Sequence, residues 1–469
     1  MARKDIPHPE DTRAEFNNYT EKIGLTELHP RELEKRKKFL VNQINIGFDR
    51  IKRKEGPTQA DGGILAIPTG LPERITRGAW DKVLPGTIAV TAEIAGTNWK
   101  FYTASKTNDG SLDLSTPTIL TYPDNERKVT YEEFARRLAI PLAEKYMQAK
   151  SVSGQSEDMP LIGAISLGFP HENVLSDESP DIDAVFLLDD AGKAPKEWQI
   201  VDWDPKEKRS LAGAVRAELL KLGVDNVQSL VFINDTSAVS LDKDAEYTAV
   251  KMLGYEFFPN GNVGGSGTNS TLRGVNTEMG HSFWPTDEIF ERMKANGWTQ
   301  NERAELESET GQYLALRLAA GVQILGEYGF EITPDERTAK LHRNTQEIVG
   351  DILRSAENDP AYISRLARGE ISAEPVLVYF ANRVLTRAGQ VYGIMYAATA
   401  EAMLGEREPE DVPAAMLTEG SVIHKGHLIK SIAEVTARKL GQPIRIVEAS
   451  GAKGVTYLAM AKPYLQETA

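Results

Sequence analysis

The stretch Ser229-Leu230-Val231-Phe232-Ile233-Asn234-Asp235-Thr236 carries more information than any other part of this sequence. Its apolar run predicts a buried strand, and an Asn-Asp pair follows directly at the carboxyl end of that strand. A carboxylate in this place can accept the proton of a hydroxyl group, while the neighbouring amide holds another hydroxyl. An ordinary Asn/Asp turn, or the N-cap of a following helix, is the alternative interpretation.

Outward from this strand, the sequence alternates between apolar runs and amphipathic periods. Strands are predicted within residues 87–104 (as strand, turn and strand), 161–169, 184–188, 227–233 and 444–447. Helices are predicted over residues 32–54, 130–150, 210–222, 244–253, 311–328, 333–357, 374–404 and 424–440. Residues 56–86 are rich in Pro and Gly and read as irregular. The mixture predicts an α/β fold in which helices pack on sheets.

Composition narrows the classes of protein to consider. The chain has 469 residues, of which 41% are hydrophobic and 26% charged, so it has enough apolar material for more than one core. No apolar run approaches the ~20 residues that span a bilayer, and residues 1–20 lack the apolar centre of a signal peptide. Because the chain has no cysteine, disulfides, thiolate metal sites and cysteine nucleophiles are excluded.

The net charge of −14 disfavours binding to nucleic acid or to an anionic membrane surface. It does not disfavour a small anionic ligand, since backbone amides, a lysine and a magnesium ion hold phosphates whatever the net charge. The seven histidines show no metal-ligand spacing with carboxylates, and His281 is interpreted as a satisfied polar residue.

Two segments have the character of phosphate-binding turns. Residues 93–100 (Glu-Ile-Ala-Gly-Thr-Asn-Trp-Lys) form a predicted hairpin whose small residues let backbone amides approach a phosphate. Glu93 could hold Mg²⁺ through water, and Lys100 could face a phosphate. Residues 264–269 (Gly-Gly-Ser-Gly-Thr-Asn) expose further amides, although their spacing is neither that of a Walker A loop nor that of a dinucleotide fingerprint. A plain β-turn and a flexible loop are the alternatives.

Two more segments place polar groups beside glycine or proline. Residues 165–170 (Ile-Ser-Leu-Gly-Phe-Pro) stand at the end of a predicted strand, where open α/β sheets bind ligands. Residues 276–280 (Asn-Thr-Glu-Met-Gly) form the other segment. Taken alone, a segment such as the first is more often just a strand followed by a turn.

In their order and character these segments resemble the motifs of the hexokinase family, from about residue 35 to residue 462. Gly96-Thr97-Asn98 is similar to the family's first phosphate segment, Ser166 with Phe169-Pro170 to its sugar-binding Ser-Phe-Pro, and Asn234-Asp235-Thr236 to its catalytic Asn-Asp-Thr. Further matches are residues 64–70, 265–269, 276–280, 419–422 and 450–454, of which the last two resemble turns on the adenosine side.

The resemblance implies a role for each matching residue. Asp235 and Lys196 would be catalytic, with Asp235 as the base. The sugar would be bound by Ser166, Asn234, Asn269 and Glu278. The nucleotide would be bound by Gly96, Thr97, Asn98, Lys100, Gly265, Ser266, Gly267, Thr268, Ser421 and Gly451. Glu93 would hold Mg²⁺ through water.

The sequence departs from the family pattern at several positions. Glu93 replaces an aspartate, Ala95 a glycine and Lys100 an arginine. Around Lys196 the family has Thr-Lys-Gly-Phe, whereas this chain has Pro195-Lys196-Glu197-Trp198. The sugar-binding glutamate of the family falls at Leu316, and a nearby glutamine falls at Tyr313. These changes put one side of the sugar pocket in question and leave the catalytic and phosphate segments intact.

The expected architecture is the two-lobed actin-like ATPase (ribonuclease H-like) fold of hexokinase type, with a cleft between the lobes. Residues 85–235 would form the small lobe, residues 1–84 and 236–454 the large lobe, and residues 455–469 would return to the small lobe. The expected activity is ATP- and Mg²⁺-dependent phosphorylation of a primary hydroxyl of a glucose-like hexose, a step of glycolysis, in the cytoplasm, with lobe closure excluding water.

Two alternatives stay open. One is a kinase of a different or modified sugar or polyol on the same fold, and the other is a non-catalytic sugar-binding regulator. The expected partners are a small sugar and a nucleotide, without nucleic acid or membrane, in a monomer or homodimer.

Overall fold

The structure is a computed structural model. It describes residues 27–55, 61–64, 66–71, 75–96, 98–153, 159–169, 171–176, 179–188, 191–193, 198–253, 260–263, 268–272, 275–277, 355, 362–373, 375–406, 408, 411, 413–420, 423, 424 and 428–465. The chain divides into two compact units. Unit 1 comprises Met1–Ala66, Val263–Asn269 and Glu278–Ile446, and unit 2 comprises Ile67–Asn262, Ser270–Thr277 and Val447–Ala469. The division into lobes predicted above uses other boundaries and stays a prediction.

Unit 2 is built on an eight-stranded sheet with the order β4-β3-β2-β7-β11-β9-β8, in which β5 also pairs with β3. The strands are β2 (Ile88–Ile94), β3 (Asn98–Lys106), β4 (Leu112–Leu114), β5 (Thr118–Thr121), β7 (Leu161–Leu167), β8 (His171–Leu175), β9 (Ile182–Phe186) and β11 (Val227–Asn234). β7 runs parallel to both β2 and β11, so the carboxyl ends of these three central strands lie at one edge. A separate parallel pair is formed by β6 (Lys128–Val129) and β10 (Gln199–Ile200).

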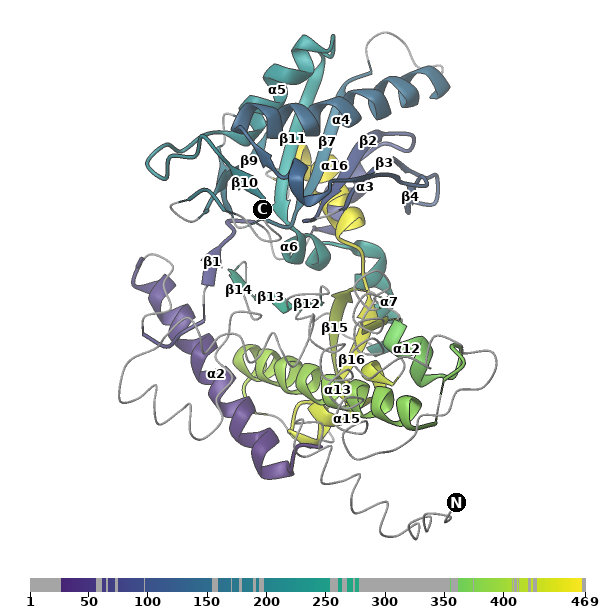
Figure 1. The fold of residues 1–469 in the computed structure, drawn as a ribbon. Helices are drawn as coiled ribbons and strands as arrows, with labels where there is room; N and C mark the ends of the chain where they lie inside the picture. Colours follow the sequence, from purple (N-terminus) through teal and green to yellow (C-terminus); the bar gives the residue numbers. More distant parts are fainter. Residues whose placement is uncertain are drawn as a thin grey trace, which may run out of the picture. The chain divides into compact units, whose positions relative to one another are not determined.

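Helices cover both faces of this sheet (Figure 1). Side chains of α4 (Tyr131–Ser153) and α5 (Leu211–Lys221) share one apolar core with one face of the central strands. The helices α3 (Arg77–Lys82) and α16 (Gly451–Leu465) share a second core with the other face. Buried strands covered on both faces need continuous apolar runs, which is the pattern that the sequence shows at β7 and β11. Two more helices, α6 (Asp235–Ser240) and α7 (Lys243–Leu253), follow β11.

In unit 1 the long helix α13 (Pro375–Leu404) packs against α2 (Pro30–Lys52), α12 (Tyr362–Ala367) and α15 (Ile429–Lys439). A Cβ on Gly393 would lie 2.6 Å from Cβ of Thr436, so the α13–α15 contact needs a glycine here. The remaining elements of the chain are short: β1 (Ala66–Pro68), η1 (Asp124–Glu126), β12 (Asn260–Val263), β13 (Thr268–Leu272), β14 (Val275–Thr277), β15 (Ala414–Glu419) and β16 (Ile444–Glu448).

Most of the predicted elements are confirmed, including the strands around residues 87–104 and the helix capped by Thr130, whose hydroxyl accepts from the amide of Glu133 at 3.2 Å. Two predictions were wrong, and two more cannot be compared with the described residues. Residues 56–86 contain β1 and α3 and are not wholly irregular. The helix predicted over residues 424–440 is not continuous: Ile423 and His424 are helical, but Leu428 has a left-handed backbone (φ 66°) and α15 begins at Ile429. The helices predicted over residues 311–328 and 333–357 lie outside the described residues, apart from Ser355.

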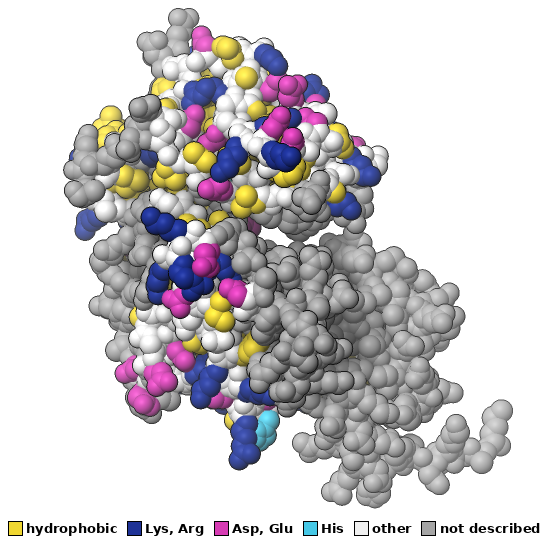
Figure 2. Space-filling view, turned by 90° about the vertical axis from the view of Figure 1, so that its left-hand side faces the viewer, with side chains coloured by type: hydrophobic (Ala, Val, Ile, Leu, Met, Phe, Trp, Pro, Cys, Tyr) yellow, Lys and Arg dark blue, Asp and Glu magenta, His cyan; other side chains and the backbone are white. Residues whose placement is uncertain are grey.

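The surface drawn in Figure 2 carries basic and acidic side chains interspersed over its described part. The described part of that face therefore carries no large field of one sign. Within the described ranges, every helix is too short or too polar to cross a membrane.

Candidate functional site

Polar residues gather where the three parallel strands β2, β7 and β11 end. In the register of the sheet, Glu93 pairs with Ser166, and Ser166 pairs with Ile233. One residue further, Ile94, Leu167 and Asn234 form the next row. Because side chains alternate along a strand, Glu93 and Ser166 project from the same face of the sheet, with Asp235 directly beyond the end of β11. Three segments singled out in the sequence therefore meet at one edge.

Asp235 is half-buried at the start of α6, and the backbone amide of Thr236 fixes its carboxylate. That amide donates to Oδ1 of Asp235 at 2.8 Å and also to the side-chain oxygen of Asn234 at 2.9 Å. Asn234 is thus the N-cap of α6, so the helix-cap interpretation of this pair is correct. Capping by Asn234 is compatible with a chemical role for Asp235, because the carboxylate of Asp235 is oriented by the same amide and stays half-buried.

The second oxygen of Asp235 faces Gly168. A Cβ added to Gly168 would lie 3.4 Å from Oδ2 of Asp235 and 3.2 Å from the carbonyl oxygen of Ile94. The amide of Gly168 donates to that carbonyl at 2.9 Å, so the backbone after β7 lies close to the end of β2. The glycine therefore lets the backbone after β7 approach Asp235 and the end of β2 closely, where a side chain would crowd both.

Glu93 lies in a small ionic group. Its Oε2 accepts a hydrogen bond from the hydroxyl of Tyr102 and pairs with Nζ of Lys100 at 3.2 Å. The side chain of Glu93 is 17% exposed, whereas that of Lys100 is 43% exposed. Oε1 of Glu93 accepts no hydrogen bond within the described part of the chain.

This geometry fits water-mediated binding of Mg²⁺. Magnesium commonly takes one or two carboxylates together with waters and substrate phosphates, so a single carboxylate with one uncommitted oxygen is sufficient. Over the residues that the structure describes, no group of three or more His, Asp or Glu side chains is placed to form a metal site from protein ligands alone. The ion would therefore bring most of its ligands with it.

Gly96, in the hairpin after β2, is hydrogen-bonded to a cluster of buried aromatic side chains. The indole N–H of Trp198, a side chain that is 1% exposed, donates to the carbonyl oxygen of Gly96. The indole of Trp99 stacks on that of Trp198, with ring centroids 5.2 Å apart and planes 20° apart. Thr97 and Lys196 lie outside the described residues, but each is next or nearly next in sequence to this pair. The hydrogen bond joins the two chain segments that carry them.

We expect Trp198→Phe to destabilise the protein more than Trp99→Phe does. Both changes remove an indole from the same buried cluster. Among the described residues, the N–H of Trp99 has no hydrogen-bond partner, whereas that of Trp198 has Gly96. Losing the donor leaves a buried carbonyl unsatisfied, which costs about 1–3 kcal/mol. Urea unfolding followed by far-UV circular dichroism measures the difference between the two variants. Equal midpoints would show that the bond to Gly96 does not stabilise the hairpin.

His171, which directly follows the Ser166–Pro170 segment, is a structural residue. It is buried, and burial lowers the pKa of its imidazole to about 4. Nδ1 lies 2.7 Å from the carbonyl oxygen of Phe169, to which the neutral ring donates. His171, the first residue of β8, is therefore uncharged at neutral pH and packs as a neutral side chain.

The first turn of α16 lies on the same face of the sheet as Glu93 and Ser166. The hydroxyl groups of Thr456 and Thr91 are hydrogen-bonded to each other, and Gly454 packs against Ala238 in α6. Because Thr91 precedes Glu93 on β2, the helix runs from the carboxyl ends of the strands into the core. Gly451, predicted to bind the nucleotide, is the first residue of this helix. The Ser450–Gly454 segment, expected as a turn, is thus largely a helix N-terminus.

The sequence does not match a known family model or a curated protein. Two solved structures cover 96% of the chain. One is a hexokinase from Schistosoma mansoni complexed with glucose, with 15% identity, 99% of its own chain covered and a TM-score of 0.61. The other is described as a hexokinase, with 14% identity, 100% covered and a TM-score of 0.63. This chain has the hexokinase fold. The prediction of an α/β, actin-like ATPase fold of hexokinase type is confirmed.

On the hexokinase fold, the structure brings together only part of the predicted site. Glu93, Gly96, Lys100, Ser166, Asn234 and Asp235 lie in unit 2 around the ends of β2, β7 and β11, and Asn98 begins β3 with its side-chain oxygen accepting from Thr121 at 2.8 Å. Thr268 and Asn269 begin β13. Thr97, Lys196, Gly265, Ser266, Gly267, Glu278 and Ser421 lie outside the described residues, as do Tyr313, Leu316 and Pro195.

Sequence reasoning missed Tyr102 and the donor role of Trp198. Tyr102 stands two residues after Lys100 on β3, so the alternation of a strand places both on one face beside Glu93. That spacing was a usable signal. The contact of Trp198 with Gly96 joins residues 102 positions apart, and no local pattern announces it.

Proposed function

We propose that this protein is an ATP-dependent kinase that phosphorylates a primary hydroxyl of a glucose-like hexose, a phosphotransferase of the hexokinase type. The observation that carries this proposal is the convergence of Glu93, Ser166 and Asp235 at the ends of three parallel strands, with Asp235 beside Gly168. Ligands of open α/β sheets lie outside the carboxyl ends of the strands. The similar schistosome hexokinase is complexed with glucose, which supports a sugar as the acceptor here.

In the proposed reaction, Oδ2 of Asp235 accepts the proton of the sugar hydroxyl. The hydroxyl oxygen then attacks the γ-phosphorus of ATP in line, and the bond to the β-γ bridging oxygen breaks to release ADP. Asn234 and Ser166 hold the sugar, together with Asn269 and Glu278. Such a reaction asks little covalent chemistry of the protein, so positioning and neutralisation of charge account for most of the rate.

The phosphates are proposed to bind at the hairpin after β2, through amides near Gly96 and the side chains of Thr97, Asn98, Lys100 and Lys196, and at the second glycine-rich segment, Gly265–Thr268. Glu93 would hold Mg²⁺ through water, and the ion would neutralise phosphate charge. Because Lys100 pairs with Glu93 at 3.2 Å, its ammonium is already oriented toward this hairpin. Ser421 and Gly451 are proposed for the adenosine side.

The test is a measurement of ATP consumption over a panel of hexoses, modified sugars and polyols, with the phosphorylated product identified by mass spectrometry. Glucose or a close analogue is expected to give a hexose 6-phosphate and stoichiometric ADP. Turnover only with another polyol would contradict glucose as the substrate but support the kinase activity. Sugar binding without any ADP would favour the non-catalytic regulator.

Leu316 is expected to weaken the binding of glucose. A leucine accepts no hydrogen bond, so a sugar hydroxyl placed against it loses water without gaining a partner, at about 1–3 kcal/mol. We therefore expect a glucose KM about 5- to 150-fold higher in the natural protein than in Leu316→Glu. The comparison requires steady-state kinetics of both proteins, and the ATP KM serves as the control. A natural protein with a tight glucose KM that the glutamate makes worse would contradict the prediction.

A further inference from the structure

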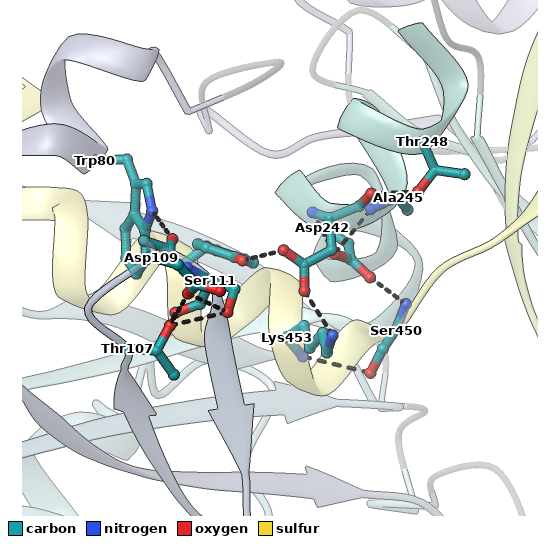
Figure 3. A network of polar contacts seen from close by, with 12 residues as sticks. Trp80, Thr107, Asp109, Ser111, Asp242, Ala245, Thr248, Ser450 and Lys453 are labelled. Carbon is teal, nitrogen blue, oxygen red and sulfur yellow. Dashed lines mark hydrogen bonds and ion pairs between the residues drawn. The ribbon is translucent and has the colours of Figure 1, made fainter. Parts of the chain in front are cut away.

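Asp242, in the link between α6 and α7, uses both carboxylate oxygens to hold backbone amides. Oδ1 accepts from the amides of Asp244 at 3.0 Å and Ala245 at 3.3 Å, and Oδ2 accepts from the amide of Ser450 at 2.8 Å (Figure 3). The side chain is buried, since the residue is only 3% exposed. The sequence segments that it joins are 208 positions apart.

The carboxylate of Asp242 contacts the N-terminal ends of two helices, α7 and α16. Asp244 and Ala245 are in the first turn of α7, so the carboxylate caps that helix. Ser450 immediately precedes α16, and its own hydroxyl oxygen accepts from the amide of Lys453 at 3.4 Å. One carboxylate therefore fixes the N-terminus of α16 relative to the N-terminus of α7.

The charge of Asp242 has no direct ion-pair partner among the described residues. Burial raises the pKa of its carboxyl to about 6, against the opposing effect of the amides of Ser450 and Ala245. Of the charged groups around it, Lys453 pairs with Asp244, not with Asp242. On α7, Lys243 donates to the carbonyl oxygen of Ile75 and pairs with Glu246. The three backbone amides, and not an ion pair, therefore compensate the burial of this carboxylate.

The first turn of α16 also contacts α6, the helix that precedes Asp242. Gly454 in α16 packs against the backbone of Ala238 in α6, so closely that a Cβ would lie 1.7 Å from the carbonyl oxygen of Ala238. Asp235 is the first residue of α6, which is only six residues long. The short helix that begins with the proposed base is thus held on one side by its own strand and on the other by the first turn of α16.

We propose that Asp242 is a positioning residue, whose carboxylate holds the Ser450–Gly454 segment in the place where the adenosine side of ATP binds and in register with Asp235. This inference rests on the proposed kinase function, because the role of the Ser450–Gly454 segment in it is to bind a nucleotide. Loss of the carboxylate raises the KM for ATP and leaves the KM for the sugar unchanged, since Ser166 and Asn234 lie on β7 and β11 and share no hydrogen bond with Asp242.

The variants that test this are Asp242→Asn and Asp242→Ala. The asparagine keeps one acceptor oxygen but presents an N–H₂ group to one of the donating amides, whereas the alanine removes both oxygens. Asp202→Asn is the control, because Oδ1 of Asp202 accepts from the amide of Tyr131 at 2.8 Å and so holds the start of α4, although its Oδ2 also pairs with Arg209 at 2.8 Å. We expect the ATP KM to rise about tenfold in both Asp242 variants, the sugar KM to stay within about twofold, and Asp202→Asn to resemble the natural protein.

A second measurement does not depend on turnover. Amide hydrogen exchange in Asp242→Asn is expected to quicken at residues 450–454 and not at residues 131–134, and Asp202→Asn is expected to show the reverse. This comparison distinguishes loss of a local contact from general destabilisation, and it remains informative if Asp242→Ala fails to fold.

The outcomes separate the inference from the function on which it rests. If the natural protein neither binds nor consumes ATP with any sugar, the proposed function fails and the inference fails with it. If the natural protein is active but both Asp242 variants keep its ATP KM, or exchange at residues 450–454 is unchanged, only the inference is overturned. An equal rise in ATP KM in Asp202→Asn overturns it as well.

Discussion

Asp235→Asn is expected to lower kcat by about 10²–10⁴-fold, the usual contribution of a general base, while sugar binding stays measurable. The amide is the same size as the carboxylate, and its oxygen can still accept the hydrogen bond that the amide of Thr236 donates at 2.8 Å. The variant therefore loses the proton acceptor at Oδ2 and keeps the start of α6. Such a loss corresponds to a barrier higher by roughly 3–5 kcal/mol.

The measurement is initial rates of ADP release at saturating sugar and ATP, with sugar affinity from calorimetry. Asp183→Asn is a suitable control, since Oδ1 of Asp183 accepts from the amides of Ala184 and Ala212 and lies on β9, beyond β11. If Asp235→Asn keeps more than about a tenth of the natural kcat, the base is another residue, because tenfold is only ~1.4 kcal/mol of barrier.

The central strands and the place of Asp235 could be predicted from the sequence because local patterns determine them. β7 and β11 are buried on both faces, so they read as continuous apolar runs, and the polar residues that end them stand out. The hairpin of β2 and β3 was visible instead from the small residues at positions 95–97 between two strand-like stretches. By contrast, β1 has three residues and α3 has six, too few to show a period within a stretch rich in Pro and Gly.

What the sequence could not predict are the contacts between distant segments. The alignment of Glu93 with Ser166 follows from strand register, and register depends on the packing of whole sheets. The bond from Trp198 to Gly96 and the bond from Ser450 to Asp242 join residues that no local spacing relates. Asp242 reads in the sequence as one more polar residue between two helices, and only its burial and its partners distinguish it.

Gly454→Ala is expected to lower the free energy of unfolding by at least about 3 kcal/mol, although alanine normally favours a helix over glycine by ~1 kcal/mol. Gly454 lies inside α16, and its Cβ would meet the carbonyl oxygen of Ala238 at 1.7 Å, its carbonyl carbon at 2.7 Å and the amide nitrogen of Asp242 at 3.1 Å. These are backbone atoms, so no side-chain rotation relieves the overlap, and α16 must move away from α6.

The measurement is the urea midpoint by far-UV circular dichroism, with Gly213→Ala as the matched control. Gly213 is also helical, but its Cβ would meet Oγ of Ser210 at 2.8 Å, which can rotate away, and Cβ of Ser210 only at 3.3 Å. This control loses at most the N-cap of α5, about 1 kcal/mol. A Gly454→Ala protein as stable as Gly213→Ala would mean that α16 and α6 tolerate separation, and the register between Asp235 and the Ser450–Gly454 segment would then not depend on their close contact.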